Sequence, residues 1–403
     1  MKLFILSKTI KMLRNKQVKK LPKKTLISFL DMFKYEKFVK YEDKIVFSIH
    51  IPPFPSKSFD RFFEAGLKAR EGTKIPGVVN IAITHKCRYN CWHCSAAPKK
   101  GKDLPLETIK NAIKTFQDMG TSTFSITGGE PLLREDLPEI IKSIDDRSSV
   151  FMFTTGYGLT EEKAKELKKV GLFGLMISLD HYTPEIHDKL RGYNGAYDIA
   201  IQGIKNAQKA NLYAGLSCVI TKEMLQKNEV WKILEIAKKL SVKEIMMFEP
   251  TPVGNLFETD DCILTAKERK QLIEYHKILN KKWKYKKYPR VSVFPYFESK
   301  DFLGCTAGYN IVYIDANGCI RPCDFTPLLF GNIQEEPIED IWQKLSTAFN
   351  KPRGFCFMLQ NYKLIRRIGD GQYPLPYTKS LEVCEKCPQG EIPLFYKKLG
   401  IKR

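Results

Sequence analysis

Three cysteines lie close together in the first quarter of the chain, in the order Cys87, Cys91 and Cys94. Their C-x3-C-x2-C spacing follows an apolar run, residues 78–83, that predicts a buried strand. Thiolates this close in sequence can wrap one soft metal centre, and iron–sulfur clusters are held by cysteine thiolates. Three ligands are one too few for a four-iron cluster, so one iron would be open to a non-protein ligand. The alternative is a structural zinc site that His85 or His93 closes as the fourth ligand.

A second motif, Thr127-Gly128-Gly129-Glu130-Pro131, ends the next predicted strand. Two adjacent glycines let the backbone approach a ligand closely and expose its carbonyls. Glu130 adds a carboxylate that can accept a hydrogen bond from a cationic amine. The alternative is a tight turn between a strand and a helix.

Polar residues also follow the fourth predicted strand. Ser178 and Asp180 have short side chains that suit the hydroxyls of a ribose, or the capping of a helix. Arg191 lies in Arg191-Gly-Tyr-Asn-Gly195, and its fork-shaped guanidinium suits a carboxylate. The alternative for Arg191 is an ordinary surface residue.

Cysteines gather again near the C-terminus, as one C-x17-C pair and one C-x2-C pair: Cys305, Cys323, Cys384 and Cys387. Four thiolates from two separated pairs can complete a four-iron cluster. A zinc ribbon is the alternative, but the wide spacing of the first pair fits it poorly. Cys319 and Cys356 are left over, and either can replace one of the four. Cys218 is expected in the core, and Cys262 in the core or at the surface.

The elements that must position these groups read as strand–helix repeats from residue 78 onward. We expect strands over 78–84, 122–126, 149–153, 173–178, 212–219 and 243–248. We expect helices between them near 105–119, 136–145, 160–169, 196–209 and 227–240. Apolar strands that alternate with amphipathic helices predict a parallel sheet with its chemistry at the C-terminal ends of the strands. Six units predict a partial (β/α)6 TIM-like barrel of the α/β class.

Four regions follow from the changes in pattern along the chain. Residues 1–77 form a basic amphipathic extension, with two short helices over 1–40 that Pro22 separates and a strand over 44–50. The barrel covers 78–264, and a helix and basic linker cover 265–290. Residues 291–403 form a smaller α+β domain, in which Asn317-Gly318 predicts the turn of a hairpin.

The chain has 403 residues and a formal net charge of +21. Residues 1–24 hold nine Lys/Arg and no acid, and 281–287 is a second basic run with Trp283 and Tyr285 between its lysines. Such charge attracts anionic lipid or RNA, on whose bases the two aromatic rings can stack; the alternative is a solvated basic surface. Clustered cysteines without an export signal favour a reducing cytoplasm, and no apolar run is long enough to span a membrane.

The cysteine and glycine motifs together resemble those of the radical S-adenosylmethionine (SAM) superfamily. The resemblance implies that Cys87, Cys91 and Cys94 hold a 4Fe-4S cluster whose open iron binds SAM. It also implies that Gly128, Gly129 and Glu130 bind the SAM amino group, Ser178 and Asp180 the ribose, and Arg191 the SAM carboxylate. The C-terminal cysteines resemble the Twitch/SPASM extension of this superfamily, which carries an auxiliary 4Fe-4S cluster.

The function that this resemblance implies is reductive cleavage of SAM to a 5′-deoxyadenosyl radical. That radical abstracts hydrogen from an unactivated carbon of a peptide, tetrapyrrole or lipid. The auxiliary cluster then assists oxidation or binds the substrate. We expect a ferredoxin or flavodoxin as electron donor, and a cytoplasmic protein that meets the membrane periphery through residues 1–40. Modification of RNA is one alternative, and a non-catalytic metal-binding scaffold is another.

Overall fold

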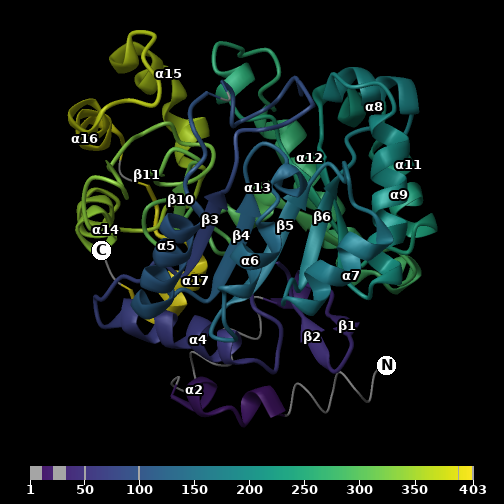
Figure 1. The fold of residues 1–403 in the computed structure, drawn as a ribbon, viewed down its shortest axis with the longest axis horizontal. Helices are drawn as coiled ribbons and strands as arrows, with labels where there is room; N and C mark the ends of the chain where they lie inside the picture. Colours follow the sequence, from purple (N-terminus) through teal and green to yellow (C-terminus); the bar gives the residue numbers. More distant parts are fainter. Residues whose placement is uncertain (1–10, 21–32, 50, 99, 389, 402–403) are drawn as a thin grey trace.

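The computed structural model describes residues 11–20, 33–49, 51–98, 100–388 and 390–401. Within these residues one ten-stranded sheet organises the fold, in the order β12-β11-β10-β3-β4-β5-β6-β7-β8-β9 (Figure 1). The strands from β10 through β3 to β9 run parallel, whereas β11 and β12 are antiparallel to their neighbours. Parallel strands end at the same edge of a sheet, so their C-terminal loops gather at one end of the molecule.

The six predicted barrel strands are present, and the α/β partial-barrel prediction is confirmed. They are β3 Val78–Ala82, β4 Thr123–Thr127, β5 Ser149–Thr154, β6 Gly174–Ser178, β7 Tyr213–Val219 and β8 Glu244–Phe248. The helices between them are α5 Leu106–Met119, α6 Leu137–Lys142, α7 Glu161–Lys169, α9 Ala196–Lys209 and α11 Val230–Lys239. Shorter elements that the sequence did not predict are η2 Pro131–Leu133, α8 Pro184–Arg191, α10 Lys222–Gln226 and η3 Gly254–Leu256.

The helices form because each has one apolar face to bury. In α5, Ile109, Ile113 and Phe116 recur at helical spacing and are almost completely buried. The helix ends at Gly120, whose positive φ of 116° closes the last turn. Helices of this kind cover the outer side of the sheet and leave the loops at its C-terminal edge free for chemistry (Figure 1).

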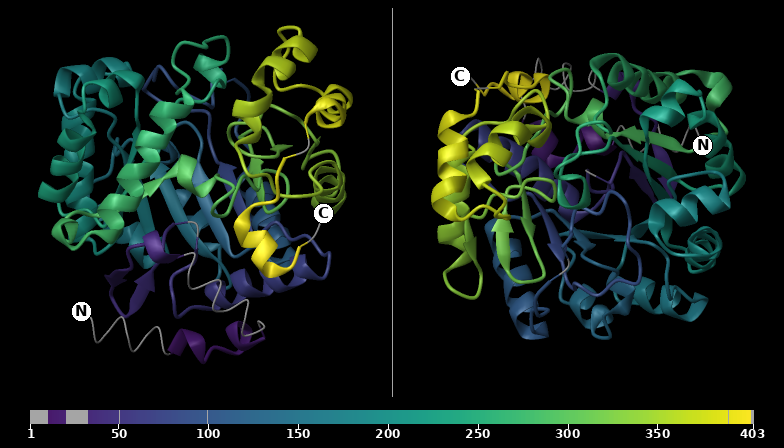
Figure 2. Two further views of the ribbon diagram at one scale, coloured as in Figure 1. Left: turned by 180° about the vertical axis from the view of Figure 1, so that it is seen from behind. Right: turned by 90° about the horizontal axis from the view of Figure 1, so that it is seen from above.

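The C-terminal third extends the same sheet at both edges. β9 Arg290–Val293 adds to β8, and β10 Ile311–Ile314 adds to β3, with Val312 opposite Val79. The predicted hairpin is confirmed, since β11 Cys319–Arg321 pairs antiparallel with β10, and β12 Gly331–Asn332 follows. The helices of this part are α12 Ala266–Lys281, η4 Trp283–Tyr285, α13 Phe294–Phe297, α14 Ile338–Ala348, α15 Phe357–Gly369, α16 Tyr377–Lys386 and α17 Leu394–Leu399. Seen from above, the residues from β10 to the C-terminus lie along one side of the barrel (Figure 2).

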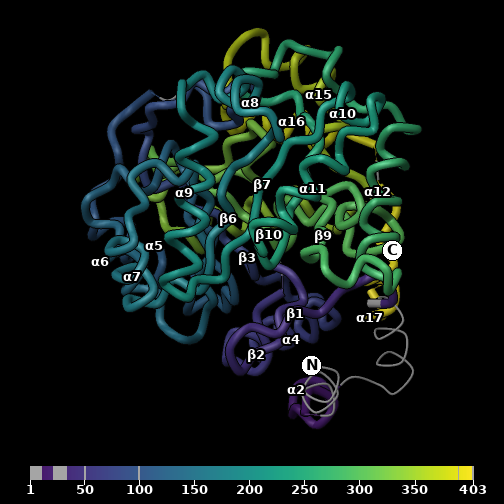
Figure 3. Tube along the Cα trace, turned by 90° about the vertical axis from the view of Figure 1, so that its right-hand side faces the viewer, coloured from purple at the N-terminus to yellow at the C-terminus, as the bar shows by residue number. Residues whose placement is uncertain are grey.

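An N-terminal layer closes the other end of the barrel, below the N-terminal ends of the strands (Figures 1 and 3). Its elements are α2 Lys16–Lys19, η1 Phe33–Tyr35, β1 Val39–Tyr41, β2 Lys44–Val46 and α4 Lys57–Arg70. Asn15 at the start of α2 donates to Asp60 of α4 at 2.6 Å, and Val18 is buried. The described part of the basic extension is therefore a packed layer. The remaining residues of the two predicted helices, 1–10 and 21–32, lie outside the described residues.

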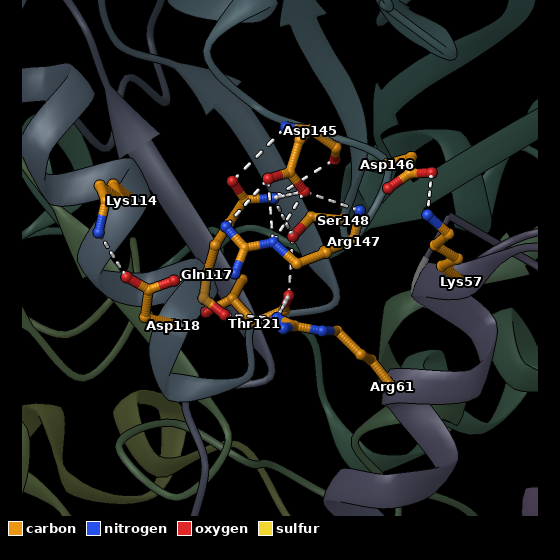
Figure 4. A network of polar contacts seen from close by, with 10 residues as sticks. All are labelled: Lys57, Arg61, Lys114, Gln117, Asp118, Thr121, Asp145, Asp146, Arg147 and Ser148. Carbon is orange, nitrogen blue, oxygen red and sulfur yellow. Dashed lines mark hydrogen bonds and ion pairs between the residues drawn. The ribbon is translucent and has the colours of Figure 1, made fainter.

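Polar contacts fix this layer to the barrel (Figure 4). Lys57 pairs with Asp146 at 2.7 Å, and Arg61 donates to the carbonyls of Gln117 and Thr121 in front of β4. Further along the layer, Glu36 pairs with the buried Arg290 of β9. No helix in the described part of the chain is both long enough and apolar enough to cross a bilayer.

Candidate functional site

A cavity of about 330 Å³ lies inside the barrel and opens toward the C-terminal ends of the strands. Many of the predicted site residues line it: Cys87, Cys91, Cys94, Gly128, Gly129, Ser178, Arg191, Cys305 and Cys323. Glu130, Asp180, Cys384 and Cys387 are not among its lining residues. The structure therefore brings both cysteine groups to one space, although about 200 residues separate them in sequence.

The loop that carries the first three cysteines is held by the loop after β8. Asn255 donates its side chain to the Cys91 carbonyl at 2.8 Å and its backbone N–H to the Cys94 carbonyl at 3.1 Å. The preceding Gly254 has a φ of 56°, and a Cβ there would lie 2.0 Å from the Cys94 carbonyl oxygen. Only a glycine at position 254 therefore lets the loop after β8 lie this close to the cysteine loop. The sequence carried no signal for this clamp, because its residues stand apart from any motif.

Asp103 holds the start of the same loop. Its carboxylate accepts from Thr84 Oγ1 at 2.6 Å and from the backbone N–H of His85 at 2.7 Å. The His85 ring lies 3.1 Å from Asn317 Oδ1 in the hairpin turn, which ties the cysteine loop to the C-terminal third. His93 instead lines the cavity with the cysteines.

The Gly-Gly-Glu segment runs alongside the cysteine loop. Gly129 N–H donates to the Thr84 carbonyl and Glu130 N–H to the Lys86 carbonyl, both at 2.7 Å. A Cβ on Gly128 would meet the Thr84 carbonyl at 2.6 Å, and one on Gly129 the Lys86 carbonyl at 2.2 Å. The two glycines are thus required for the cysteine loop and the glycine loop to lie side by side.

The Glu130 side chain is buried and joins two loops. Its carboxylate accepts four hydrogen bonds, from Thr154 Oγ1, the Thr155 N–H and Oγ1, and the Leu132 N–H. Burial raises the pKa of Glu130 above its usual value, although these bonds oppose the shift. The predicted contact of Glu130 with an amine stays a prediction. The hydrogen bonds that the Glu130 carboxylate accepts from Thr154 and Thr155 also fix the loop after β5.

Asp180 and Arg191 form a buried ion pair beside Cys91. Arg191 Nη2 lies 2.7 Å from Asp180 Oδ2, and Arg191 Nη1 donates to Cys91 Sγ at 3.7 Å. The other Asp180 oxygen accepts from the Val219 N–H at 2.9 Å. Burial alone would raise the pKa of Asp180, but Arg191, the two neighbouring histidines and the Val219 N–H together outweigh it, and the pKa is lowered. Burial raises the pKa of the Cys91 thiol, and Arg191 opposes that shift.

Two neutral histidines flank this ion pair. Burial lowers the pKa of both His93 and His187 to about 4. His187 Nδ1 accepts from the Asp180 N–H at 3.1 Å, and His93 Nδ1 lies 3.8 Å from Asp180 Oδ2. His181 follows Asp180 but is buried, and it accepts from the Thr183 N–H at 3.0 Å. The charge at this end of the cavity is therefore carried by Asp180 and Arg191.

The C-terminal cysteines are joined through Arg353. The backbones of Cys305 and Arg353 pair in both directions, at 2.7 and 2.9 Å. The Arg353 side chain donates to Cys387 Sγ at 3.3 Å and to the Pro388 carbonyl at 2.7 Å. Burial raises the pKa of the Cys305 and Cys384 thiols to about 12, so both hold their protons until a metal binds.

The remaining cysteines differ in their surroundings. Cys356 is buried at the start of α15, and burial, then Glu298 and Cys305, raise its pKa. It therefore lies near the candidate cluster ligands. Cys319 lies on β11 and accepts from Asn332 at 3.7 Å. Cys218 is completely buried, as predicted, and Cys262 is half-buried.

The residues present fit an iron–sulfur cluster with an added small ligand. Three thiols of one loop share a cavity with two exposed glycine backbones and a buried guanidinium. Arg191 Nε is buried and has no hydrogen-bond partner in the described structure. Across the described residues, no group of three or more Cys, His, Asp or Glu is arranged around a single metal-ion position.

Comparisons with known proteins agree with this donor set. A sequence model of the radical SAM superfamily matches residues 81–240, and one of an iron–sulfur cluster-binding domain, SPASM, matches residues 305–388. The AdoMet-dependent heme synthase of Methanosarcina barkeri is 29% identical over 303 residues, which cover 70% of this chain and 86% of that protein. A probable GTP 3′,8-cyclase of Saccharolobus islandicus is 29% identical over 285 residues, 65% of this chain and 90% of its own length.

Solved structures show the same fold. Streptococcus suis SuiB bound to precursor peptide SuiA superposes with a TM-score of 0.60 at 15% identity, and the match covers 80% of each chain. The chain is therefore an enzyme of the radical SAM superfamily with a C-terminal SPASM iron–sulfur domain, and its cofactors are SAM, a 4Fe-4S cluster that binds SAM, and an auxiliary 4Fe-4S cluster.

Proposed function

We propose that this enzyme abstracts hydrogen from an unactivated carbon in an apolar part of its substrate, and that the product is oxidised. One observation carries the proposal: a single cavity is lined both by Cys87, Cys91 and Cys94 and by Cys305 and Cys323. A substrate in this cavity would share one space with both cysteine groups. When bound, the cofactors supply a 5′-deoxyadenosyl radical and an acceptor for one electron.

The protein's own residues hold and orient these groups. Cys87, Cys91 and Cys94 would hold the first cluster, and the backbone of Gly128 and Gly129 with Ser178 and Arg191 would hold SAM. The second cluster would be held by Cys305, Cys323, Cys384 and Cys387. Asp180 keeps the Arg191 guanidinium in place through their 2.7 Å contact. A ferredoxin or flavodoxin is the class of electron donor that such an enzyme needs.

The walls of the cavity favour an uncharged substrate segment. Aromatic rings surround it, and Phe248 and Phe294 contact each other at 4.8 Å between centroids. Arg191 is the one Lys or Arg among the lining residues of the described chain, and Asp180 already neutralises it. The lining acids Glu249, Glu298 and Asp324 have raised pKa values because of burial. With Arg191 engaged by Asp180 and needed for SAM, a triphosphate or a carboxylate of the substrate would find no further cation here, so we favour the hydrocarbon chain of a lipid.

Oxidation of a tetrapyrrole side chain is the second candidate. It is supported by the relative named AdoMet-dependent heme synthase, which is 29% identical over 303 residues. The apolar macrocycle of a tetrapyrrole suits the aromatic walls, but the carboxylates of a tetrapyrrole would have to lie outside the cavity. The two candidates therefore differ in one respect: a tetrapyrrole must keep its carboxylates outside the aromatic cavity, whereas a hydrocarbon chain carries none.

The test uses the anaerobically reconstituted, reduced full chain with SAM. We expect 5′-deoxyadenosine from the wild type and none from Cys91→Ala, while Cys262→Ala, outside the cavity, keeps the activity. A lipid extract, iron coproporphyrin III and GTP are then compared for a substrate mass change. Turnover by Cys91→Ala would exclude the assigned cluster site. A mass change in the porphyrin alone would replace the lipid candidate with the second one.

A further inference from the structure

A basic loop with one exposed indole lies between α12 and β9. We define it by Trp283 and its five lysines: Lys281, Lys282, Lys284, Lys286 and Lys287. The Trp283 side chain is 71% exposed, far more than other large apolar side chains in the described residues, and all five lysines are exposed. Because the loop precedes a parallel strand, it lies at the N-terminal end of the barrel, opposite the cysteine loop.

The charge of this loop is uncompensated. None of its five lysines makes an ion pair with any described acid, whereas the nearby Lys277 pairs with Glu274 at 3.0 Å and Lys238 pairs with Glu235 at 2.9 Å. Three of the loop lysines, Lys281, Lys284 and Lys286, lie over aromatic rings instead, and Lys286 Nζ is 3.7 Å from the centre of the Trp283 ring. Five positive charges are therefore available to an anionic partner.

The backbone of the loop is fixed in place. Lys37 of the N-terminal layer donates to the carbonyls of Tyr285, Lys286 and Tyr288. The Tyr285 ring turns inward and packs on Trp231 at 5.5 Å and on Tyr288 at 5.6 Å. Of the two aromatic rings in this loop, only that of Trp283 thus points outward. The backbone that carries it is already ordered, so binding of a partner does not require it to become ordered.

We propose that this basic loop docks the enzyme on an anionic lipid bilayer. Tryptophan favours the headgroup level of a membrane, and lysines near an anionic surface are attracted to it. Single-stranded RNA is bound on several successive aromatic rings. The loop shows one fully exposed ring, because Tyr285 is partly buried against Trp231 and Tyr288, so the bilayer is the better match.

The position of the loop fits this partner. The N-terminal layer at the same end displays further exposed cations on and beside α2, among them Arg14, Lys16 and Lys19. The apolar cavity also extends to this layer, where Ile49 and Phe62 line it. Docking through the basic loop would therefore leave the cysteine loop facing away from the membrane. The proposal does not depend on the identity of the substrate.

Co-sedimentation of the full chain with vesicles tests the proposal without any turnover. We expect binding to phosphatidylcholine vesicles that contain phosphatidylglycerol, weaker binding in high salt, and little binding to pure phosphatidylcholine. Replacing all five loop lysines by glutamine should lower the partition coefficient at least about tenfold, and Trp283→Ser should lower it several-fold. Both variants change exposed side chains, so the fold should persist.

A matched control removes the same charge elsewhere. Five exposed lysines on the outer helices, none of which makes an ion pair with a described acid, are replaced by glutamine: Lys142, Lys169, Lys189, Lys205 and Lys239. This variant should keep most of the binding. Equal losses in both five-lysine variants would show a response to net charge alone and would overturn the proposal. So would unchanged binding by the loop variant, or loop-dependent binding of single-stranded RNA without binding to vesicles.

Discussion

Arg353 donates its Nη2 to Cys387 Sγ at 3.3 Å, while its backbone pairs with Cys305. Arg353 is 6% exposed, and its guanidinium makes no ion pair with a carboxylate of the described residues. Arg191 makes the same kind of contact with Cys91, but Asp180 neutralises it. One buried cation thus faces each cysteine group, and only the first is balanced by an acid.

The unbalanced charge at Arg353 should raise the reduction potential of the auxiliary cluster. Hydrogen bonds to sulfur and nearby positive charge both stabilise the reduced state. We expect Arg353→Gln to shift that potential downward and Arg353→Lys, which keeps the charge, to shift it less. Redox titration followed by electron paramagnetic resonance measures both. Arg366→Gln, which removes a cation bound to Asp260 in the same region, is the control. An unchanged potential in Arg353→Gln with its full iron content would contradict this role.

The loop clamp at Gly254 gives a second prediction. A methyl group there would meet the Cys94 carbonyl at 2.0 Å, whereas Gly158, with a similar positive φ of 79°, has open space around it. Gly158→Ala should cost about 1 kcal/mol from backbone strain alone. Gly254→Ala should cost about 1–3 kcal/mol more through overpacking and should lower the iron held by the first three cysteines. Urea unfolding and iron analysis measure the two effects, and equal behaviour of the two variants would argue against the clamp.

The buried pair of Asp180 and Arg191 should contribute strongly to stability. Asp180→Asn keeps the shape but leaves the Arg191 charge buried without its partner, which typically costs about 3–5 kcal/mol. Asp118→Asn is the control, because Asp118 pairs with Lys114 and Arg147 at the surface (Figure 4). The loss of stability in Asp118→Asn should be much smaller than in Asp180→Asn, since solvent screens exposed ion pairs. Similar losses in urea unfolding would contradict the assigned importance of the buried pair.

Acid should weaken the fold through His187. Its pKa is lowered to about 4 by burial, below the ordinary 6.5, so the unfolded chain binds the proton more readily between these values. Stability is therefore lost as the pH falls from about 6.5 towards 4, by about 2 kcal/mol at pH 5. His187→Asn removes this titration and should show a flatter dependence between pH 7.5 and pH 5. Parallel plots of the free energy of unfolding against pH for the wild type and His187→Asn would contradict this prediction.

Most of the barrel could be predicted because its signals are local. The strand at Val78–Ala82 is a continuous apolar run, and α5 has an uninterrupted apolar stripe. By contrast, α8 was missed because its sequence lacks such a stripe, and its Ile186 is 43% exposed. The pairing of β10 with β3 was also missed, since no local pattern specifies a partner strand so far away in sequence.

The candidate site could be predicted as a set of cysteines and glycines, but not as a connected structure. Asn255 and Arg353 stand outside every motif, and their contacts with Cys91 and Cys387 exist only after folding. The sequence also does not show which single side chains are exposed. The alternative of RNA binding has Tyr285 stack on bases beside Trp283, yet Tyr285 packs into an aromatic cluster that the sequence does not reveal.

The pairing of β10 with β3 joins the flanks of the two cysteine groups. β3 leads into the first cysteine loop, and β10 lies between Cys305 and Cys323, so adjacent strands carry the flanks of both groups. Strands in one sheet keep a spacing of about 4.8 Å. The relative position of the two groups is therefore set by a continuous hydrogen-bonded sheet and not by a hinge between domains. Substrates of different size would have to be accommodated by the loops.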